Sequence, residues 1–229
     1  MKLNFTFIFL FFVILLSINT NDFPKNTKNF LNLNSNTVRQ IIKSSIDNSL
    51  ISIVFSFNDD DSSKKYTLQK INMDQSSHRI FYEFDLNDDP IKMVINQNNN
   101  LILVVTENKN LLTISQDGEL ISKIKIENNS NAAILNFEFN QIDDSFYIFF
   151  IDHKTDNRTI IKYNPHGKEE WRHELRKGNS FFLGLTSITI SYKDQLLFLA
   201  LEYDSKEYVI YKISFNGELS EFKIKKKSI

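Results

Sequence analysis

One segment that looks like a β-hairpin occurs three times in the chain and a fourth time in a looser form. The four copies are Leu68–Phe84 (the looser one), Leu111–Ile126, Ile160–Leu175 and Ile210–Ile224. The turns of successive copies are separated by 43, 49 and 50 residues. A fixed period in this range is the sequence signature of a repeat architecture. The chain is therefore predicted to be built from four similar units.

Each copy has the residue pattern of two antiparallel strands joined by a tight turn. Apolar and polar residues alternate before the turn, as at Leu112 and Ile114, which is typical of a strand with one buried face. The central turn residues are Asp117-Gly118, His166-Gly167 and Asn216-Gly217, with Gln75 in the glycine position of the looser copy. Such pairs suit a type I′ turn, in which both central residues have positive φ. We therefore predict a two-residue hairpin turn in each unit.

Two further apolar runs precede each hairpin. The runs next to the hairpins are Ile51–Phe57, Leu101–Thr106, Phe146–Ile151 and Leu196–Leu201. The earlier runs are Val38–Ile42, Ile91–Ile95, Ile134–Phe139 and Leu185–Ile190. Four antiparallel strands per unit, repeated radially, describe the blade of a β-propeller. The sequence thus predicts an all-β fold, a β-propeller of about four four-stranded antiparallel blades, with a β-sandwich as the alternative.

The hairpin Ile160–Trp171 has the pattern aliphatic-x-Lys-aromatic, then glycine, then tryptophan four residues later. In this pattern the chain resembles the repeats of quinoprotein-type (PQQ-like) β-propellers, over about 190 residues. That resemblance implies a propeller fold. Quinoprotein enzymes have eight blades and dedicated cofactor and calcium ligands, whereas this chain has half that length and no residues that match those ligands. No cofactor is therefore expected.

The first 20 residues have the composition of a signal peptide. Lys2 provides a short positive start, and the apolar run Phe5–Ile18 has the length of a signal-peptide core, short of a membrane span. An uncleaved anchor is the alternative. Residues 21–35 are predicted to be a linker and residues 36–229 the propeller-like domain. The protein is expected to be extracellular or to lie in the lumen of the secretory pathway, without membrane contact after signal cleavage.

Composition restricts the chemistry of the domain. The chain has no cysteine, so disulfides and thiolate chemistry are excluded. Its net charge is −1 with acidic and basic residues interspersed, which gives no indication of nucleic-acid binding. Asn128 and Asn157 begin N-glycosylation sequons and are predicted to carry glycans. No nucleophile elbow, phosphate-binding loop or zinc-protease motif occurs, and no catalytic residue is assigned.

Acidic residues gather in two predicted loops of the first unit. They are Asp59, Asp60 and Asp61 in one loop, and Asp85, Asp88 and Asp89 in the other. Both loops are expected on one face of a propeller, and carboxylate oxygens are the ligands that Ca²⁺ prefers. A calcium site is therefore one interpretation. The other is two ordinary solvated loops, since neither has the spacing of an EF-hand.

The leading functional hypothesis is a secreted, non-catalytic binding module for a protein or glycan ligand. The first alternative is a propeller-type enzyme, a hydrolase or quinoprotein relative, using polar residues of the innermost strands. These are Lys92, Asn96, Asn136, Glu138, Asn140, Thr186 and Thr189. The second is a truncated remnant of a larger propeller. A homodimer that completes a ring is also consistent with the repeat number.

Overall fold

The computed structural model describes residues 36–44, 46–47, 49–58, 63–72, 77–126, 131–175, 187–202 and 207–225. The predicted signal peptide and linker lie outside these residues. Within them, no helix is long and apolar enough to cross a membrane.

Sixteen strands form four separate four-stranded sheets, here called blades 1 to 4. Blade 1 consists of β1 (Asn36–Lys43), β2 (Ser49–Asn58), β3 (Ser63–Asn72) and β4 (Ser77–Glu83). Blade 2 consists of β5 (Pro90–Ile95), β6 (Ile102–Thr106), β7 (Asn110–Ile114) and β8 (Leu120–Lys125). Blade 3 consists of β9 (Ala132–Phe139), β10 (Phe146–Asp152), β11 (Arg158–Tyr163) and β12 (Glu169–Leu175). Blade 4 consists of β13 (Ser187–Ser191), β14 (Leu196–Glu202), β15 (Glu207–Ser214) and β16 (Leu219–Lys225).

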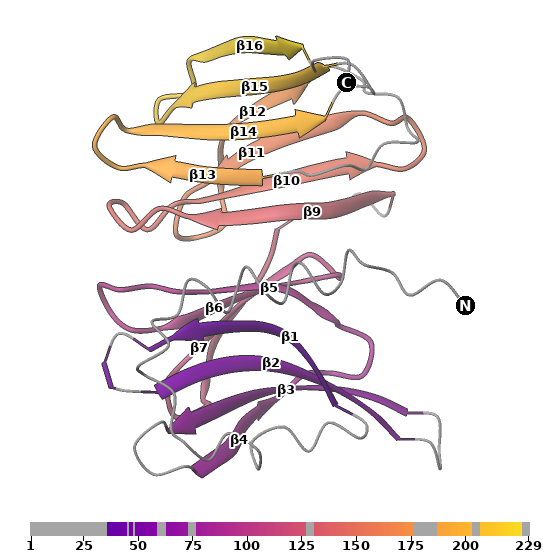
Figure 1. Ribbon diagram of the computed structural model, residues 1–229, viewed down its shortest axis with the longest axis vertical. Helices are drawn as coiled ribbons and strands as arrows, with labels where there is room; N and C mark the ends of the chain where they lie inside the picture. The colour runs from indigo at the N-terminus through magenta and orange to yellow at the C-terminus, as the bar shows by residue number, and fades with distance from the viewer. Residues whose placement is uncertain are drawn as a thin grey trace.

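In every blade the strands pair antiparallel in the order of the chain. The first strand of each blade is innermost, and β1, β5, β9 and β13 lie next to one another in turn. Figure 1 shows blades 1 and 2, in indigo to magenta, in one half of the molecule and blades 3 and 4, in pink to yellow, in the other. The predicted all-β propeller with four-stranded blades is confirmed. Four small separate sheets replace the two large facing sheets that a sandwich would require.

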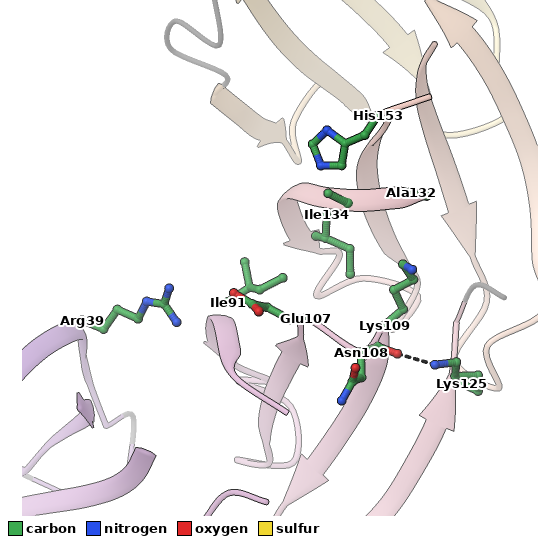
Figure 2. Close-up of a pocket in the computed structure, with 10 residues that line it drawn as sticks. Arg39, Ile91, Glu107, Asn108, Lys109, Lys125, Ala132, Ile134 and His153 are labelled. Atoms are coloured by element: carbon green, nitrogen blue, oxygen red, sulfur yellow. Dashed lines mark hydrogen bonds between the residues drawn. The ribbon is translucent and has the colours of Figure 1, made fainter. Parts of the chain in front are cut away.

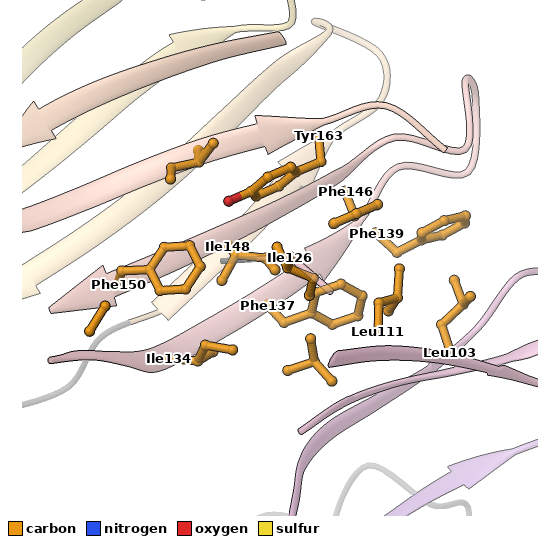
Figure 3. Close-up of a cluster of buried hydrophobic side chains, with 13 residues drawn as sticks. Leu103, Leu111, Ile126, Ile134, Phe137, Phe139, Phe146, Ile148, Phe150 and Tyr163 are labelled. Atoms are coloured by element: carbon orange, nitrogen blue, oxygen red, sulfur yellow. The ribbon is translucent and has the colours of Figure 1, made fainter. Parts of the chain in front are cut away.

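The apolar core lies between the blades, in three clusters. One joins blades 1 and 2, the next joins blades 2 and 3, and the last joins blades 3 and 4. Figure 3 shows the cluster between blades 2 and 3, to which Phe137, Phe146 and Ile148 contribute from blade 3. In β10, Tyr147 and Phe149 point the other way, into the cluster with blade 4. A strand covered on both faces needs apolar residues at every position, which explains the uninterrupted run Phe146–Ile151.

The hairpin turns have a different geometry from the predicted type I′. Only the glycine of each turn has positive φ, at +94° in Gly118, +78° in Gly167 and +93° in Gly217. In blade 2 the amide of Gly118 donates to the carbonyl of Ser115, and the amide of Ser115 donates to that of Glu119. This is a three-residue loop, a type I turn closed by a left-handed glycine. The type I′ prediction was wrong because the loop has one residue more than was assumed.

Each turn glycine lies against the outermost strand of the preceding blade. A methyl group at Gly118 would overlap the carbonyl oxygen of Phe81 in β4, and one at Gly167 would overlap the side chain of Ile124 in β8. At Gly217 it would lie 3.1 Å from the ring of Trp171 in β12. The glycines therefore set how closely successive blades approach one another.

In the part of the chain that the structure describes, the four blades follow one another as an arc. Neighbouring inner strands contact each other from β1 to β5, from β5 to β9 and from β9 to β13. Among the described residues, no apolar cluster joins blade 4 to blade 1. The face of blade 4 that points away from blade 3 is consequently uncovered there.

Candidate ligand-binding pocket

A pocket of about 770 Å³ opens between blades 1, 2 and 3, on the face that carries the connections between second and third strands (Figure 2). Its lining residues are Arg39, Ile91, Glu107, Asn108, Lys109, Lys125, Ala132, Ala133, Ile134 and His153. This volume lies in the range of small-ligand sites, about 300–1,000 Å³.

β-Bulges in the inner strands place the side chains on the inner side of the pocket. The pairing of β1 with β2 skips Arg39, and the pairing of β5 with β6 skips Ile91. In β9 the pairing skips Leu135, next to the pocket residue Ile134. A bulge leaves one residue unpaired and re-aims its side chain. The irregularity recurs at the same point of three successive blades, so the pocket is a product of the repeat.

Arg39 is held in place at the edge of blade 1. Its guanidinium donates a hydrogen bond of 2.7 Å to the carbonyl of Pro90 and lies 5.3 Å from the centre of the Tyr66 ring. Burial raises the pKa of Tyr66, the positive charge of Arg39 opposes that rise, and Asp89 adds to it. Tyr66 therefore stays a neutral phenol at physiological pH, and Arg39 lies over its ring at an exposed position.

Two lysines line the opposite side. Lys109 occupies the left-handed region with φ of 60°, and its backbone bonds to Thr106 and Ile126 fix the turn between β6 and β7. The ammonium of Lys125 donates to the carbonyl of Asn108, as the dashed line in Figure 2 marks. Arg39 and the exposed imidazole of His153 also line the pocket. Glu107 is the one lining residue that carries a carboxylate. The charge around the pocket is therefore predominantly positive.

The wall of the pocket on the side of the inner strands is apolar. Ile91, Ala132, Ala133 and Ile134 form it, and Ala132 and Ile134 also belong to the core cluster between blades 2 and 3. A wall that is part of a packed core keeps its shape, because core side chains interdigitate at crystal-like density. Apolar walls with a few placed charges are typical of ligand-binding sites.

Three of the polar residues predicted for the inner strands bond to each other. The ammonium of Lys92 lies 3.0 Å from the amide oxygen of Asn136 and 3.3 Å from the carboxylate of Glu138. Asn96 donates to Asp144 at 3.0 Å, and the side chain of Asn140 is fully buried. Thr189 is exposed, and Thr186 lies outside the described residues. Lys92, Asn136 and Glu138 thus connect blade 2 to blade 3.

The residues of the calcium prediction are only partly described. Asp59, Asp60 and Asp61 lie outside the described residues. Asp88 is buried, and its carboxylate accepts hydrogen bonds from the side chain of Asn110 at 2.7 Å and the amide of Asn108 at 3.2 Å. Asp85 is exposed and lies 3.4 Å from the ammonium of Lys123, while the backbone carbonyl of Asp89 accepts from Glu107. Within the part of the chain that the structure covers, no three His, Asp or Glu side chains are grouped as a metal site would need.

The predicted glycosylation site Asn157 and two histidines, His166 and His173, occupy a loop, a hairpin turn and an outer strand. Asn157 is half-buried in the connection between β10 and β11, and Asn128 lies outside the described residues. His166 is exposed at a hairpin turn, as expected. His173 lies with its Nε2 2.7 Å from the carbonyl oxygen of Gly217 in the next blade. Both histidines are therefore tied to hairpin structure.

Comparison with known proteins bears on the fold. No protein-family model matches the chain, and no curated protein sequence matches it either. Among solved structures, the β-propeller domain of the trilobed protease from Pyrococcus furiosus superposes with a TM-score of 0.57 at 14% identity. The match covers 84% of this chain and 58% of that one. The propeller of Dos1 gives a TM-score of 0.55 at 13% identity, with 83% and 47% covered. An acylaminoacyl peptidase in complex with a chloromethyl ketone gives a TM-score of 0.58 at 13% identity, with 83% and 33% covered.

These similarities establish the class: the chain is a β-propeller protein. It spans 58% or less of the solved chains that it resembles. At 13–14% identity the likeness concerns the fold alone and carries no activity to this chain.

The pocket was not predicted from the sequence. Its residues are dispersed from Arg39 to His153, and only the blade arrangement brings them together. The bulges at Arg39 and Ile91 do not change the apolar pattern of their strands, so the pattern does not predict them. Repetition of the units was the one usable signal, since it places the corresponding loops on one face.

Proposed function

We propose that this chain is a secreted, non-catalytic binding module that holds an anionic group of its ligand in the pocket between blades 1, 2 and 3. The observation that carries the proposal is the charge of the lining, in which Arg39, Lys109 and Lys125 face one carboxylate, that of Glu107, beside an apolar wall. Carboxylate, sulfate and phosphate groups form charge-assisted hydrogen bonds with such cations. Loops on a rigid propeller are a common place for binding residues.

The test is a titration of the glycan-free protein with a fluorescent heparin-derived hexasaccharide, which carries sulfate and carboxylate groups. We expect saturable binding that weakens as salt is added, because counterions screen exposed charges. Arg39→Ala and Lys125→Ala should each weaken binding roughly tenfold, the loss of one charge-assisted hydrogen bond. Lys193→Ala, at an exposed lysine in the turn between β13 and β14, is the matched control.

Salt-independent binding, or an equal loss in Lys193→Ala, would contradict the pocket as the site. Circular dichroism of each variant separates a lost contact from a lost fold, since Arg39 and Lys125 also bond to backbone carbonyls.

Secretion rests on the apolar run Phe5–Ile18, and glycosylation on the sequons of Asn128 and Asn157. Expression of the full-length gene in a eukaryotic secretory host tests both. Amino-terminal sequencing should locate cleavage near residue 20, and peptide N-glycosidase should lower the apparent mass. A protein retained in the membrane would favour the uncleaved anchor.

A relationship to the quinoprotein-type superfamily is part of the proposal. Trp171, which carries the resemblance, contacts Gly217 and donates through Nε1 to the carbonyl of Phe215 at 3.2 Å. The tryptophan therefore has a structural role between repeats that a shared repeat pattern would preserve. The calcium site also remains a proposal, and a rise in melting temperature on adding Ca²⁺ that Asp88→Asn abolishes would support it. No specific observation favours the enzyme alternative.

A further inference from the structure

The uncovered face of blade 4 has the composition of an interface. Alternation in β15 sends Val209, Tyr211 and Ile213 toward blade 3, so Ile210 and Lys212 point away from it. Across the next pairing, Ile210 faces Phe222 of β16. Phe222 is 55% exposed and Ile224, two residues further on the same side, is 49% exposed. Phe198 and Ala200 of β14 extend the same side and are half-buried.

The same positions are buried in the preceding blade. In blade 3, Ile160 pairs with His173 and Lys162 pairs with Trp171, and these four residues face blade 4. Ile160 is fully buried there and Lys162 is 6% exposed. Their counterparts in blade 4 are Ile210 with Phe222 and Lys212 with Ser220. Blade 4 therefore repeats the surface by which blade 3 binds its neighbour.

In a repeat protein the apolar face of each unit is buried against a neighbouring unit. Blade 4 keeps the apolar pattern of an internal unit on the face that nothing covers among the described residues. Exposed apolar side chains gathered in this way mark interaction surfaces.

We propose that this face binds the same face of a second copy of the chain, so that two arcs join through their fourth blades. The face corresponds to the faces through which blades 1, 2 and 3 each pack against the next blade. A two-fold contact would cover it, because each apolar strip then has an identical strip as partner. Such isologous dimers are the commonest oligomers. Blade 1 offers no counterpart, because on its side away from blade 2 the residues Ser52, Val54 and Thr67 are already 5% exposed or less.

The dimer leaves the pocket open. The pocket lies between blades 1, 2 and 3, and no residue of blade 4 lines it. A dimer would carry two pockets and would bind a repetitive ligand with greater apparent affinity than either pocket alone. The dimer itself is independent of the proposed function, because it rests on blade 4 alone.

The experiment is light scattering on the deglycosylated chain from Asn21 onward, at high micromolar concentration. The wild type should have the mass of a dimer and Phe222→Asp the mass of a monomer. Ile121→Asp is the control, because Ile121 lies on β8, the fourth strand of its own blade, and is 53% exposed. It should remain dimeric. Circular dichroism and Trp171 fluorescence verify that each variant is folded.

A second measurement tests the symmetry of the contact. Because the chain has no cysteine, Phe222→Cys introduces one unique thiol. Across a two-fold contact through this face, mild oxidation should produce a disulfide-linked dimer, and Ile121→Cys should not. A monomeric wild type, a dimer that persists in Phe222→Asp, or equal cross-linking of the two cysteine variants would each overturn the proposal. Binding of the hexasaccharide by Phe222→Asp should continue, which separates this test from that of the pocket.

Discussion

At the scale of single residues, the turn glycines do two things that no other residue can do together. Gly118 has φ of +94°, in a region that residues with a Cβ rarely adopt, and its α-carbon faces the backbone of β4 in the preceding blade. The side chain of Ser115 accepts hydrogen bonds from the amides of Asp117 and Glu119 and closes the turn. The side chain of Asn164 bonds to His166 and Lys168 in the same way in blade 3. The repeated glycine therefore fixes turn shape and blade spacing at once.

Gly118→Ala should lower the free energy of unfolding by about 3 kcal/mol. Positive φ alone costs an alanine roughly 1–2 kcal/mol, and the carbonyl of Phe81, as backbone, cannot move aside cheaply. Gly217→Ala is the matched control, because it has nearly the same φ but meets only the ring of Trp171 at 3.1 Å. Its cost should stay near about 1–2 kcal/mol. Urea unfolding of the three proteins measures both, and equal losses would show that the close contact contributes nothing.

At the scale of structural elements, the outer strands of blade 3 hold the last hairpin of blade 4. The ammonium of the buried Lys162 lies 2.8 Å from the Glu170 carboxylate and 3.3 Å from both the Asp143 carboxylate and the Phe215 carbonyl oxygen. Trp171 bonds to the same carbonyl. A lysine that is 6% exposed is stable only with such partners. Lys162 therefore joins the two blades by a charge-assisted hydrogen bond to Phe215, while its two ion pairs stay within blade 3.

Lys162→Met should cost about 1–2 kcal/mol, since methionine fills most of the space and the two carboxylates, each 41% exposed, remain hydrated. The loss should depend on pH. Burial acts to raise the pKa of Asp143. Its hydrogen bonds with Ser145 and the positive charge of Lys162 outweigh that effect, so the pKa lies below its usual value. A carboxylate with a depressed pKa stabilises the fold above its unfolded pKa, near 4, and loses that effect as pH falls.

The difference in unfolding free energy between wild type and Lys162→Met should therefore shrink as the pH is lowered below about 4. Urea titrations of both proteins at a series of pH values measure it. A difference that stays constant or grows in acid would contradict the role of Lys162 as partner of Asp143.

At the scale of the whole molecule, the blades differ in how many neighbours they have. Blades 2 and 3 are covered on both faces by apolar clusters, whereas among the described residues blade 4 shares an apolar cluster only with blade 3. Stability within a protein varies with such burial, and elements with fewer buried contacts open at lower free energy. Blade 4 is therefore the part of the arc where local opening should begin.

Hydrogen exchange followed by mass spectrometry should show this order. In the monomeric variant Phe222→Asp, amides of β14 and β15 should exchange faster than those of β6 and β10. In the wild-type dimer, the protection of blade 4 should approach that of blade 3, because its outer face is then covered. Uniform protection in the monomer would mean that the arc unfolds as one unit and that blade 4 gains little from a partner.

The repeat made most of the fold predictable. Each predicted apolar run overlaps a strand in the described residues, as with Phe146–Ile151 in β10 and Leu196–Leu201 in β14. Apolar runs and turn glycines arise from local chemistry, so a sequence displays them. The predicted turn type was wrong. A three-residue loop and a two-residue loop can both end on Asx-Gly, and they differ only in which flanking residues pair through backbone hydrogen bonds. The pocket was missed for a related reason, because the bulge at Arg39 changes direction without changing the residue pattern.

The sequence by itself therefore determined the unit, its strand order and the number of blades, because burial of alternate side chains and the special backbone of glycine are local constraints. Tertiary structure alone decided which faces of the blades meet and which remain open. The gathering of Arg39, Lys109 and Lys125 at one pocket and the exposure of Phe222 on blade 4 both depend on the direction in which the blades follow one another. That direction comes from packing between residues some 50 positions apart, such as Gly217 on Trp171, and no single repeat contains it.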